Sequence, residues 1–193
     1  MNTSSSIQPG ASIASSDTLN VSQTIGSERK QVAESCFEFL FGAMVNVVAT
    51  STPDSDSEAG MARLERMGYE VGYRFLERCA QKRVLPSEPL EIIKFICKDF
   101  WTEVFKKQVD KLQTDHRGTF VLKDLDFRWL ARYASDNNPE NCLMVAKMIQ
   151  FPCGLIRGAL ENLGVNSAVR AEFSDEKNNI TLPVCSFTIR TRP

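Results

Sequence analysis

The chain has 193 residues, a length that suits one domain with an ordinary hydrophobic core and a tail. Its 23 basic and 24 acidic residues leave a formal charge of -1, which argues against the basic surface of a nucleic-acid-binding protein. Its 6 cysteines are widely spaced and its one histidine is His116, so we expect neither a metal site nor a cofactor.

The first residues lack the basic and apolar regions of a secretion signal, and no later apolar run reaches the roughly 18 residues of a membrane span. We therefore expect a cytoplasmic protein with reduced cysteines. Residues 1–27 are rich in Ser and Thr with few apolar residues, which predicts a disordered tail. Residues 28–193 are expected to form a single domain.

The first predicted helix runs from Glu28 to Ala49 and has two apolar rows instead of one. One row consists of Cys36, Leu40, Met44 and Val47, and the other of Phe37, Phe41, Val45 and Val48. A helix of this kind must be covered on more than one side. A second helix, from Ser57 to about Lys82, has a single apolar face.

A third helix is predicted from Pro89 towards Lys107, in the most apolar segment of the chain. Its lysines form a basic edge that could touch an anionic membrane, although a solvated face explains them more simply. These lysines are Lys94, Lys98, Lys106, Lys107 and Lys111. Two short apolar runs, 118–122 and 127–130, predict a hairpin around the polar turn 123–126.

Residues 140–163 predict a helix that Pro152 kinks or divides and that Gly164 ends. Residues 165–173 and 184–190 predict strands, the second with strict alternation of apolar and polar residues. The fold class is therefore α+β, with four to five helices packed on a small twisted antiparallel sheet of about four strands.

Two features of the predicted helix 140–163 bear on chemistry. Cys153 is a candidate nucleophile only if His116 lies beside it, and a small buried hydrophobic residue is the simpler interpretation. Gly154 and Gly158, four residues apart, predict the close approach of another helix, because the pattern of a phosphate-binding loop is absent. We therefore predict no catalytic residue.

Several long segments are more specific than a fold class. They include Glu91–Trp101 (EIIKFICKDFW), Thr114–Leu122 (TDHRGTFVL) and Phe151–Leu160 (FPCGLIRGAL), with Met67–Gly72 (MGYEVG) before them. These segments closely resemble subunit 6 of the transport protein particle, TRAPP. The resemblance covers about residues 30 to 190. It implies the fold of the small TRAPP subunits, in agreement with the α+β class above.

The resemblance also implies a role. Family members form heterodimers with the acylatable small TRAPP subunit through their first two helices. The assembled complex tethers vesicles between endoplasmic reticulum and Golgi and exchanges nucleotide on a Rab-type GTPase. The chain would be a non-catalytic, structural subunit of the cytoplasm, with peripheral association at most with cis-Golgi, trans-Golgi and ER-derived membranes.

Periodicity and the family geometry together indicate candidate interface residues on the first two helices. They are Phe37, Phe41, Met44, Val45, Met61, Leu64 and Tyr69. The alternative function is a module of the same fold that binds an acyl chain or another hydrophobic ligand. The surplus of aromatic residues in the third helix suggests this alternative; they are Phe95, Phe100, Trp101 and Phe105.

Overall fold

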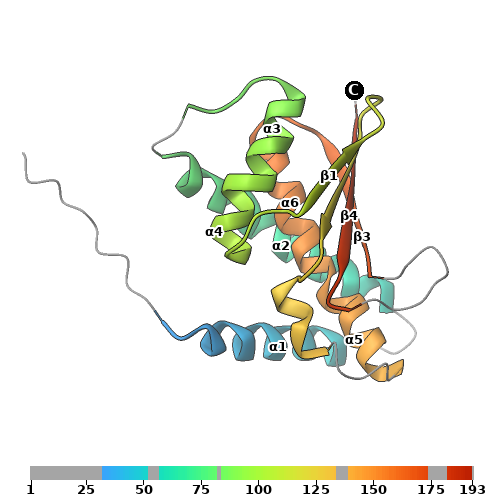
Figure 1. Ribbon diagram of the computed structural model, residues 1–193. Coiled ribbons are helices and arrows are strands. Elements are labelled where there is room, and N and C mark those ends of the chain that lie inside the picture. The colour runs from blue at the N-terminus through green and yellow to red at the C-terminus, as the bar shows by residue number, and fades with distance from the viewer. Residues whose placement is uncertain (1–31, 52–56, 82–83, 134–138, 174–181, 193) are drawn as a thin grey trace, which may run out of the picture. The chain divides into compact units, whose positions relative to one another are not determined.

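A computed structural model describes residues 32–51, 57–81, 84–133, 139–173 and 182–192 (Figure 1). The chain divides into two units, Met1–Val32 and Ala33–Pro193, and every described helix and strand belongs to the second. The helices are α1 (Glu34–Ser51), α2 (Ser57–Ala80), α3 (Pro89–Phe95), the π-helical turn η2 (Ile96–Phe100), α4 (Trp101–Phe105), the 3-10 helix η3 (Arg128–Tyr133), α5 (Pro139–Met148) and α6 (Gln150–Asn162). The tail predicted over residues 1–27 lies outside the described residues, and the single domain over 28–193 stays a prediction.

The sheet has four strands, β1 (Lys111–Thr114), β2 (Thr119–Asp124), β3 (Ser167–Glu172) and β4 (Cys185–Thr191). Their spatial order is β1-β2-β4-β3, and all neighbours are antiparallel. Alternate side chains on one face enter the main core, among them Phe120, Leu122, Phe187 and Ile189. The predicted α+β class, with helices packed on a four-stranded antiparallel sheet, is confirmed.

Glycines bring α2 and α6 into close contact (Figure 1). A Cβ atom added at Gly68 would lie 2.1 Å from the carbonyl oxygen of Phe151, and one added at Gly154 would lie 1.9 Å from that of Glu65. Gly72 and Gly158 meet the opposing backbone in the same way. The predicted helix approach at Gly154 and Gly158 is therefore confirmed, and its partner is α2.

The third predicted helix forms as the continuous run α3, η2 and α4. The π-turn changes the angle between successive side chains, and the adjacent residues Phe100 and Trp101 are both fully buried. The run ends at Lys106, which has a left-handed backbone with φ of 62°. The aromatic surplus of this segment therefore belongs to the core.

The predicted hairpin between residues 118–122 and 127–130 is wrong. β2 pairs with β1 on one side and with β4 on the other. Phe127 and Leu130 are both buried, which suits the three residues per turn of η3 better than the alternation of a strand. β1 was missed because its four residues, Lys-Leu-Gln-Thr, include one large apolar side chain.

The predicted helix 140–163 is divided, as expected, into α5 and α6. Pro152 lies in the first turn of α6, where its missing N–H needs no partner. Gly164, with φ of 79°, ends α6 and donates a backbone hydrogen bond to Glu161. The run Cys142–Asn162 does have the length and hydropathy of a membrane span, contrary to our expectation, but 67% of its apolar window is buried, as in a core helix.

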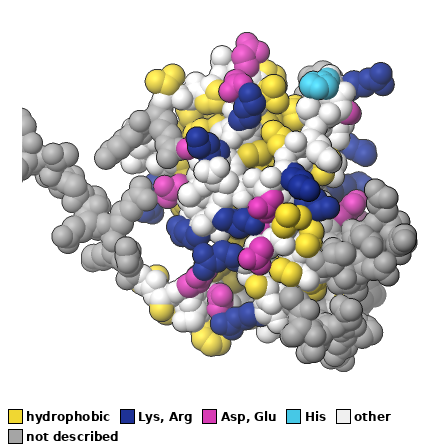
Figure 2. Space-filling model, in the orientation of Figure 1, with side chains coloured by type: hydrophobic (Ala, Val, Ile, Leu, Met, Phe, Trp, Pro, Cys, Tyr) yellow, Lys and Arg dark blue, Asp and Glu magenta, His cyan; other side chains and the backbone are white. Residues whose placement is uncertain are grey.

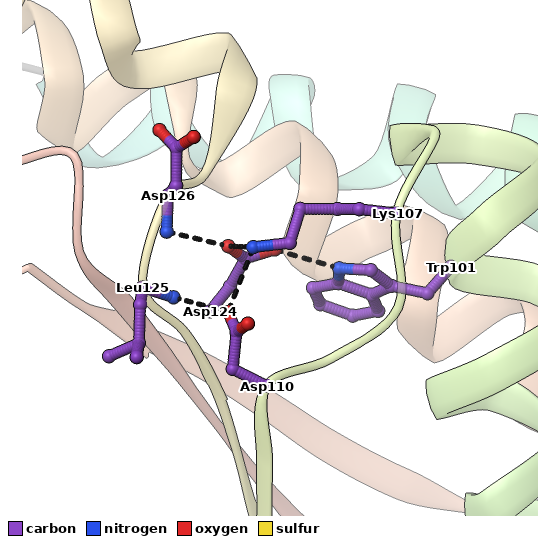
Figure 3. A network of polar contacts seen from close by, with 6 residues as sticks. All are labelled: Trp101, Lys107, Asp110, Asp124, Leu125 and Asp126. Atoms are coloured by element: carbon purple, nitrogen blue, oxygen red, sulfur yellow. Dashed lines mark hydrogen bonds and ion pairs between the residues drawn. The ribbon is translucent and has the colours of Figure 1, made fainter.

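A buried carboxylate ties α4 to the sheet (Figure 3). Asp124, at the end of β2, is 0% exposed and accepts a hydrogen bond of 2.9 Å from the indole Nε1 of Trp101. Its Oδ1 accepts 2.7 Å and 3.0 Å hydrogen bonds from the Lys107 Nζ and the Asp126 backbone. A buried charge needs such partners, so these contacts set where the segment after α4 meets the sheet.

Lys107 extends the network to a second carboxylate. Its Nζ lies 2.8 Å from Asp110, which also accepts a 2.7 Å hydrogen bond from the Leu125 backbone. These two hydrogen bonds hold the pKa of Asp110 below its usual range. Burial lowers the pKa of Lys107, but its hydrogen bonds to Asp110 and Asp124 and their charges outweigh this, so the net shift is upward.

We expect the stabilising effect of Asp110 to depend on pH. Because the pKa of Asp110 is lower in the folded than in the unfolded chain, its contribution is present above about pH 4 and is lost as the pH falls through the folded value. Asp110→Asn should therefore lower the free energy of unfolding at pH 7, and the difference from wild type should vanish in acid. Urea denaturation between pH 7 and pH 2 measures this. The exposed Asp126→Asn is the control, and an equal pH dependence in the two variants would contradict the assignment.

Candidate partner interface

Three of the four residues in one apolar row of α1 are buried inside the subunit, and the fourth, Phe37, is 37% exposed. Phe41, Val45 and Val48 are each less than 5% exposed. They form a second core cluster with Leu64 of α2 and three residues of α5 and α6, which are Met148, Phe151 and Leu155. Helices α2, α5 and α6 of the same chain therefore cover this row.

Two ion pairs and a set of aromatic rings hold α1 against η3. Arg128 pairs with Glu34, and Arg132 pairs with Glu38. The four-residue spacing is the same on both helices, so the two pairs form side by side. The Trp129 ring lies 4.9 Å from the Phe37 ring, and this contact continues the second core cluster to the surface.

The other row of α1 faces outwards. Leu40 is 69% exposed and Val47 is 62% exposed, and Phe39 beside them is 70% exposed. We call these three residues the outer row of α1. Figure 2 shows hydrophobic side chains at the lower left surface, where Figure 1 places α1. On α2, Met67, Val71 and Tyr73 are also exposed.

The seven predicted interface residues divide by burial. Phe41, Val45 and Leu64 are buried in the second core cluster, while Phe37, Met44, Met61 and Tyr69 are partly accessible. Whether any of them contacts a partner stays a prediction. The outer row was missed as a candidate, although the spacing of Leu40 and Val47 had already marked a second apolar face.

Arg157 contacts Tyr69, one of the partly accessible interface candidates. Its guanidinium forms a two-pronged ion pair with Glu65, with distances of 2.5 Å and 3.0 Å, and lies 4.4 Å from the centre of the Tyr69 ring. Arg157 therefore pairs with a carboxylate of its own chain. Tyr69 is consequently held in one orientation at the edge of α2.

Comparisons with known proteins agree with this architecture. The model of the transport protein particle (TRAPP) component family matches residues 37–192. This chain belongs to the TRAPP component family. Trafficking protein particle complex subunit 6B of Homo sapiens is 40% identical over 158 residues, which cover 81% of this chain and 95% of that protein. Subunit 6A of Homo sapiens is 38% identical over 156 residues, covering 79% and 93%.

A solved structure shows the same fold. Trafficking protein particle complex subunit 3 from Naegleria fowleri, covalently bound to palmitic acid, superposes with a TM-score of 0.66 at 18% identity and covers 82% of this chain and 94% of that one. The predicted resemblance to TRAPP subunit 6 is confirmed by the relatives, which are named as subunits of a trafficking complex.

Cys153 of this TRAPP component does not form a nucleophilic site with His116. Cys153 is buried in α6, and burial raises its pKa to about 12, so the thiol stays protonated. His116 is exposed in the turn between β1 and β2. Burial likewise raises the pKa of Cys97 to about 12. The thiol-enzyme alternative therefore has no support in the geometry.

The aromatic residues that motivated the ligand-binding alternative pack against one another. Phe95, Phe100, Trp101 and Phe105 all belong to the main core cluster, and the Trp101 and Phe105 rings lie 4.6 Å apart. None of these four aromatic residues lines the hollow beside Phe37 and Trp129, the one beside Tyr69 and Tyr73, or the one beside Arg170 and Arg190. The aromatic residues of this segment therefore build the core of the subunit itself.

Proposed function

We propose that this TRAPP component is an architectural subunit that pairs, through α1 and α2, with another small TRAPP subunit of the subunit 3 type. The outer row of α1 carries the proposal: Leu40 and Val47 expose apolar surface on a helix whose other row is already buried. Exposed apolar rows of this kind are typical of protein interfaces. Phe41, Val45 and Leu64 would support the interface from behind, with the partly accessible Phe37, Met44, Met61 and Tyr69 at its edge.

The wider role follows from the complex. We propose that the subunit supports nucleotide exchange by the assembly on a Rab-type GTPase in traffic between endoplasmic reticulum and Golgi, at the cytoplasmic surface of those membranes. The names of its relatives, which are subunits of a trafficking complex, support this proposal. The subunit would contribute position and shape to the assembly rather than a reacting group.

Leu40→Asp is expected to weaken the heterodimer about 30-fold or more, since losing an apolar anchor at an interface centre removes at least about 2 kcal/mol. The subunit itself should stay folded because Leu40 is exposed. The measurement is co-expression with subunit 3, followed by light scattering and by titration calorimetry of the separated proteins.

Val84→Asp is the matched control, because Val84 is 98% exposed and lies on the link between α2 and α3. It introduces the same charge on an apolar surface residue away from α1. Phe41→Asp is unsuitable as a probe, since it would bury a carboxylate in the second core cluster and unfold the subunit. Equal heterodimer affinity for the Leu40 and Val84 variants would rule out the outer row as the contact.

A further inference from the structure

The face of the sheet turned away from the core concentrates positive charge. The strand register places one basic residue from each strand there: Lys111 of β1, Lys123 of β2, Arg170 of β3 and Arg190 of β4. Arg192, directly after β4, lines a hollow of about 440 Å³ with Arg170 and Arg190. We call these five residues the basic sheet face. Figure 2 shows Lys and Arg side chains at the upper right, beside the position of the sheet in Figure 1.

These charges are only partly balanced within the described part of the chain: the charge of Lys111 helps to lower the pKa of Asp110, and Glu172 lies on the same face of the sheet. None of the five side chains has an ion pair with a described carboxylate, and Glu172 is the one acidic residue lining the hollow. Lys111 and Lys123 lie directly opposite each other in the register, an arrangement of like charges that weakens a sheet. The whole chain has a net charge of -1, so the positive charge is concentrated locally on this face. A local concentration of positive charge attracts an anionic partner.

The distribution of the charges indicates the kind of anion. They are spread over all four strands, beyond the hollow that Arg170, Arg190 and Arg192 line. Short side chains such as Ala168 and Thr188 lie between them. Among the described residues, none of the exposed large hydrophobic side chains belongs to this face, so it offers no apolar surface that would anchor a hydrophobic side chain of a peptide. A broad, polar, basic surface fits a planar array of negative charges.

We propose that the basic sheet face adsorbs on anionic phospholipid headgroups at the membrane surface. The inference deepens the proposed membrane localisation and rests on it, but it uses elements other than α1 and α2. Attraction of this kind is electrostatic and falls off within about 8 to 10 Å at physiological salt. The subunit would hold its complex against the membrane without inserting into it.

The basic edge predicted along the third helix is a weaker candidate for the same role. Lys94 pairs with Glu91 at 2.7 Å, and Lys107 is engaged by Asp110 and Asp124. Lys106 Nζ donates a 2.8 Å hydrogen bond to the backbone of Glu103. Three of the five lysines of that edge therefore have partners within the chain.

Sedimentation with lipid vesicles tests the proposal on the full chain, alone and as its complex with subunit 3. The probes are vesicles of phosphatidylcholine with or without about one-third phosphatidylserine. Each basic residue near an anionic surface strengthens binding about fivefold, so Arg170→Gln/Arg190→Gln/Arg192→Gln should lower partition onto the anionic vesicles about 100-fold. Raising the salt concentration should release the wild-type protein.

Lys94→Gln/Lys98→Gln/Lys106→Gln is the matched control, with the same change of net charge on the third helix, and should lose only a few fold. Thermal unfolding and subunit 3 binding should be unchanged in both triple variants, which separates this proposal from the α1 interface. If folding suffers, Arg192→Gln alone, beyond the end of β4, replaces the sheet variant and should lose about fivefold. Equal binding of wild type to both kinds of vesicle, or equal losses in the two triple variants, would overturn the proposal.

Discussion

Gly158→Ala is expected to lower the free energy of unfolding by about 3 kcal/mol, the upper end of the range for overpacking a core. The added methyl group would lie 2.1 Å from the carbonyl oxygen of Tyr69 and 2.8 Å from the backbone nitrogen of Tyr73. Both atoms belong to the backbone of α2, so no side-chain rotation relieves the contact. The two helices would have to separate, and the core residues between them would lose packing. Denaturant unfolding of the purified variant measures the loss.

Gly42→Ala is the control for this prediction. A Cβ atom added at Gly42 meets no atom within 4 Å, and Gly42 lies inside α1. Glycine within a helix costs about 0.5 to 1 kcal/mol relative to alanine, so this variant should be more stable than wild type by that amount. If both variants moved the free energy of unfolding in the same direction, the distance between α2 and α6 would not be the reason for Gly158.

Asp124→Ala is expected to cost about 3 to 5 kcal/mol of stability, the range for removing one partner of a buried ion pair. The substitution leaves the indole N–H of the fully buried Trp101 without its acceptor and removes one of the two carboxylates that hold Lys107. The contact between α4 and the end of β2 would be lost with it. Urea denaturation at pH 7 measures the change.

Two further variants, Asp124→Asn and Asp126→Ala, test the loss of stability expected for Asp124→Ala. The amide oxygen of the Asn variant can still accept from Trp101, so its loss should be smaller than that of Asp124→Ala. Asp126 is exposed and contributes its backbone N–H to Asp124, so removing its side chain should change stability by about 0.5 kcal/mol or less. Similar stability of the alanine variants at 124 and 126 would show that the network does not support the fold.

Local patterns predicted most of the elements. α2 was expected from 57 to about 82 and runs from Ser57 to Ala80, because its apolar residues repeat with the period of a helix. The alternation of Cys185, Phe187 and Ile189 predicted β4 for the same kind of reason. η3 was misread as a strand because Phe127 and Trp129, two residues apart, imitate strand alternation.

The network around Asp124 could not be predicted from local patterns. An aspartate after an apolar strand normally indicates a turn exposed to water. The burial of Asp124 depends on its contacts with Trp101 and Lys107, which lie 23 and 17 residues earlier in the chain. No periodicity in the sequence connects residues at that separation, so only the packing of α4 against β2 reveals the contact.

The sequence by itself determined the fold class, the two apolar rows of α1 and the family, because these are carried by local periodicity and by long matching segments. Tertiary structure alone decided which row of α1 is buried, since that depends on Leu64, Phe151 and Leu155, which other helices bring against it. The basic sheet face likewise exists only in the folded chain. Its residues are scattered from Lys111 to Arg192, and strand register places them on one surface. Periodicity reports that a face is apolar or charged, but the rest of the fold decides what covers it.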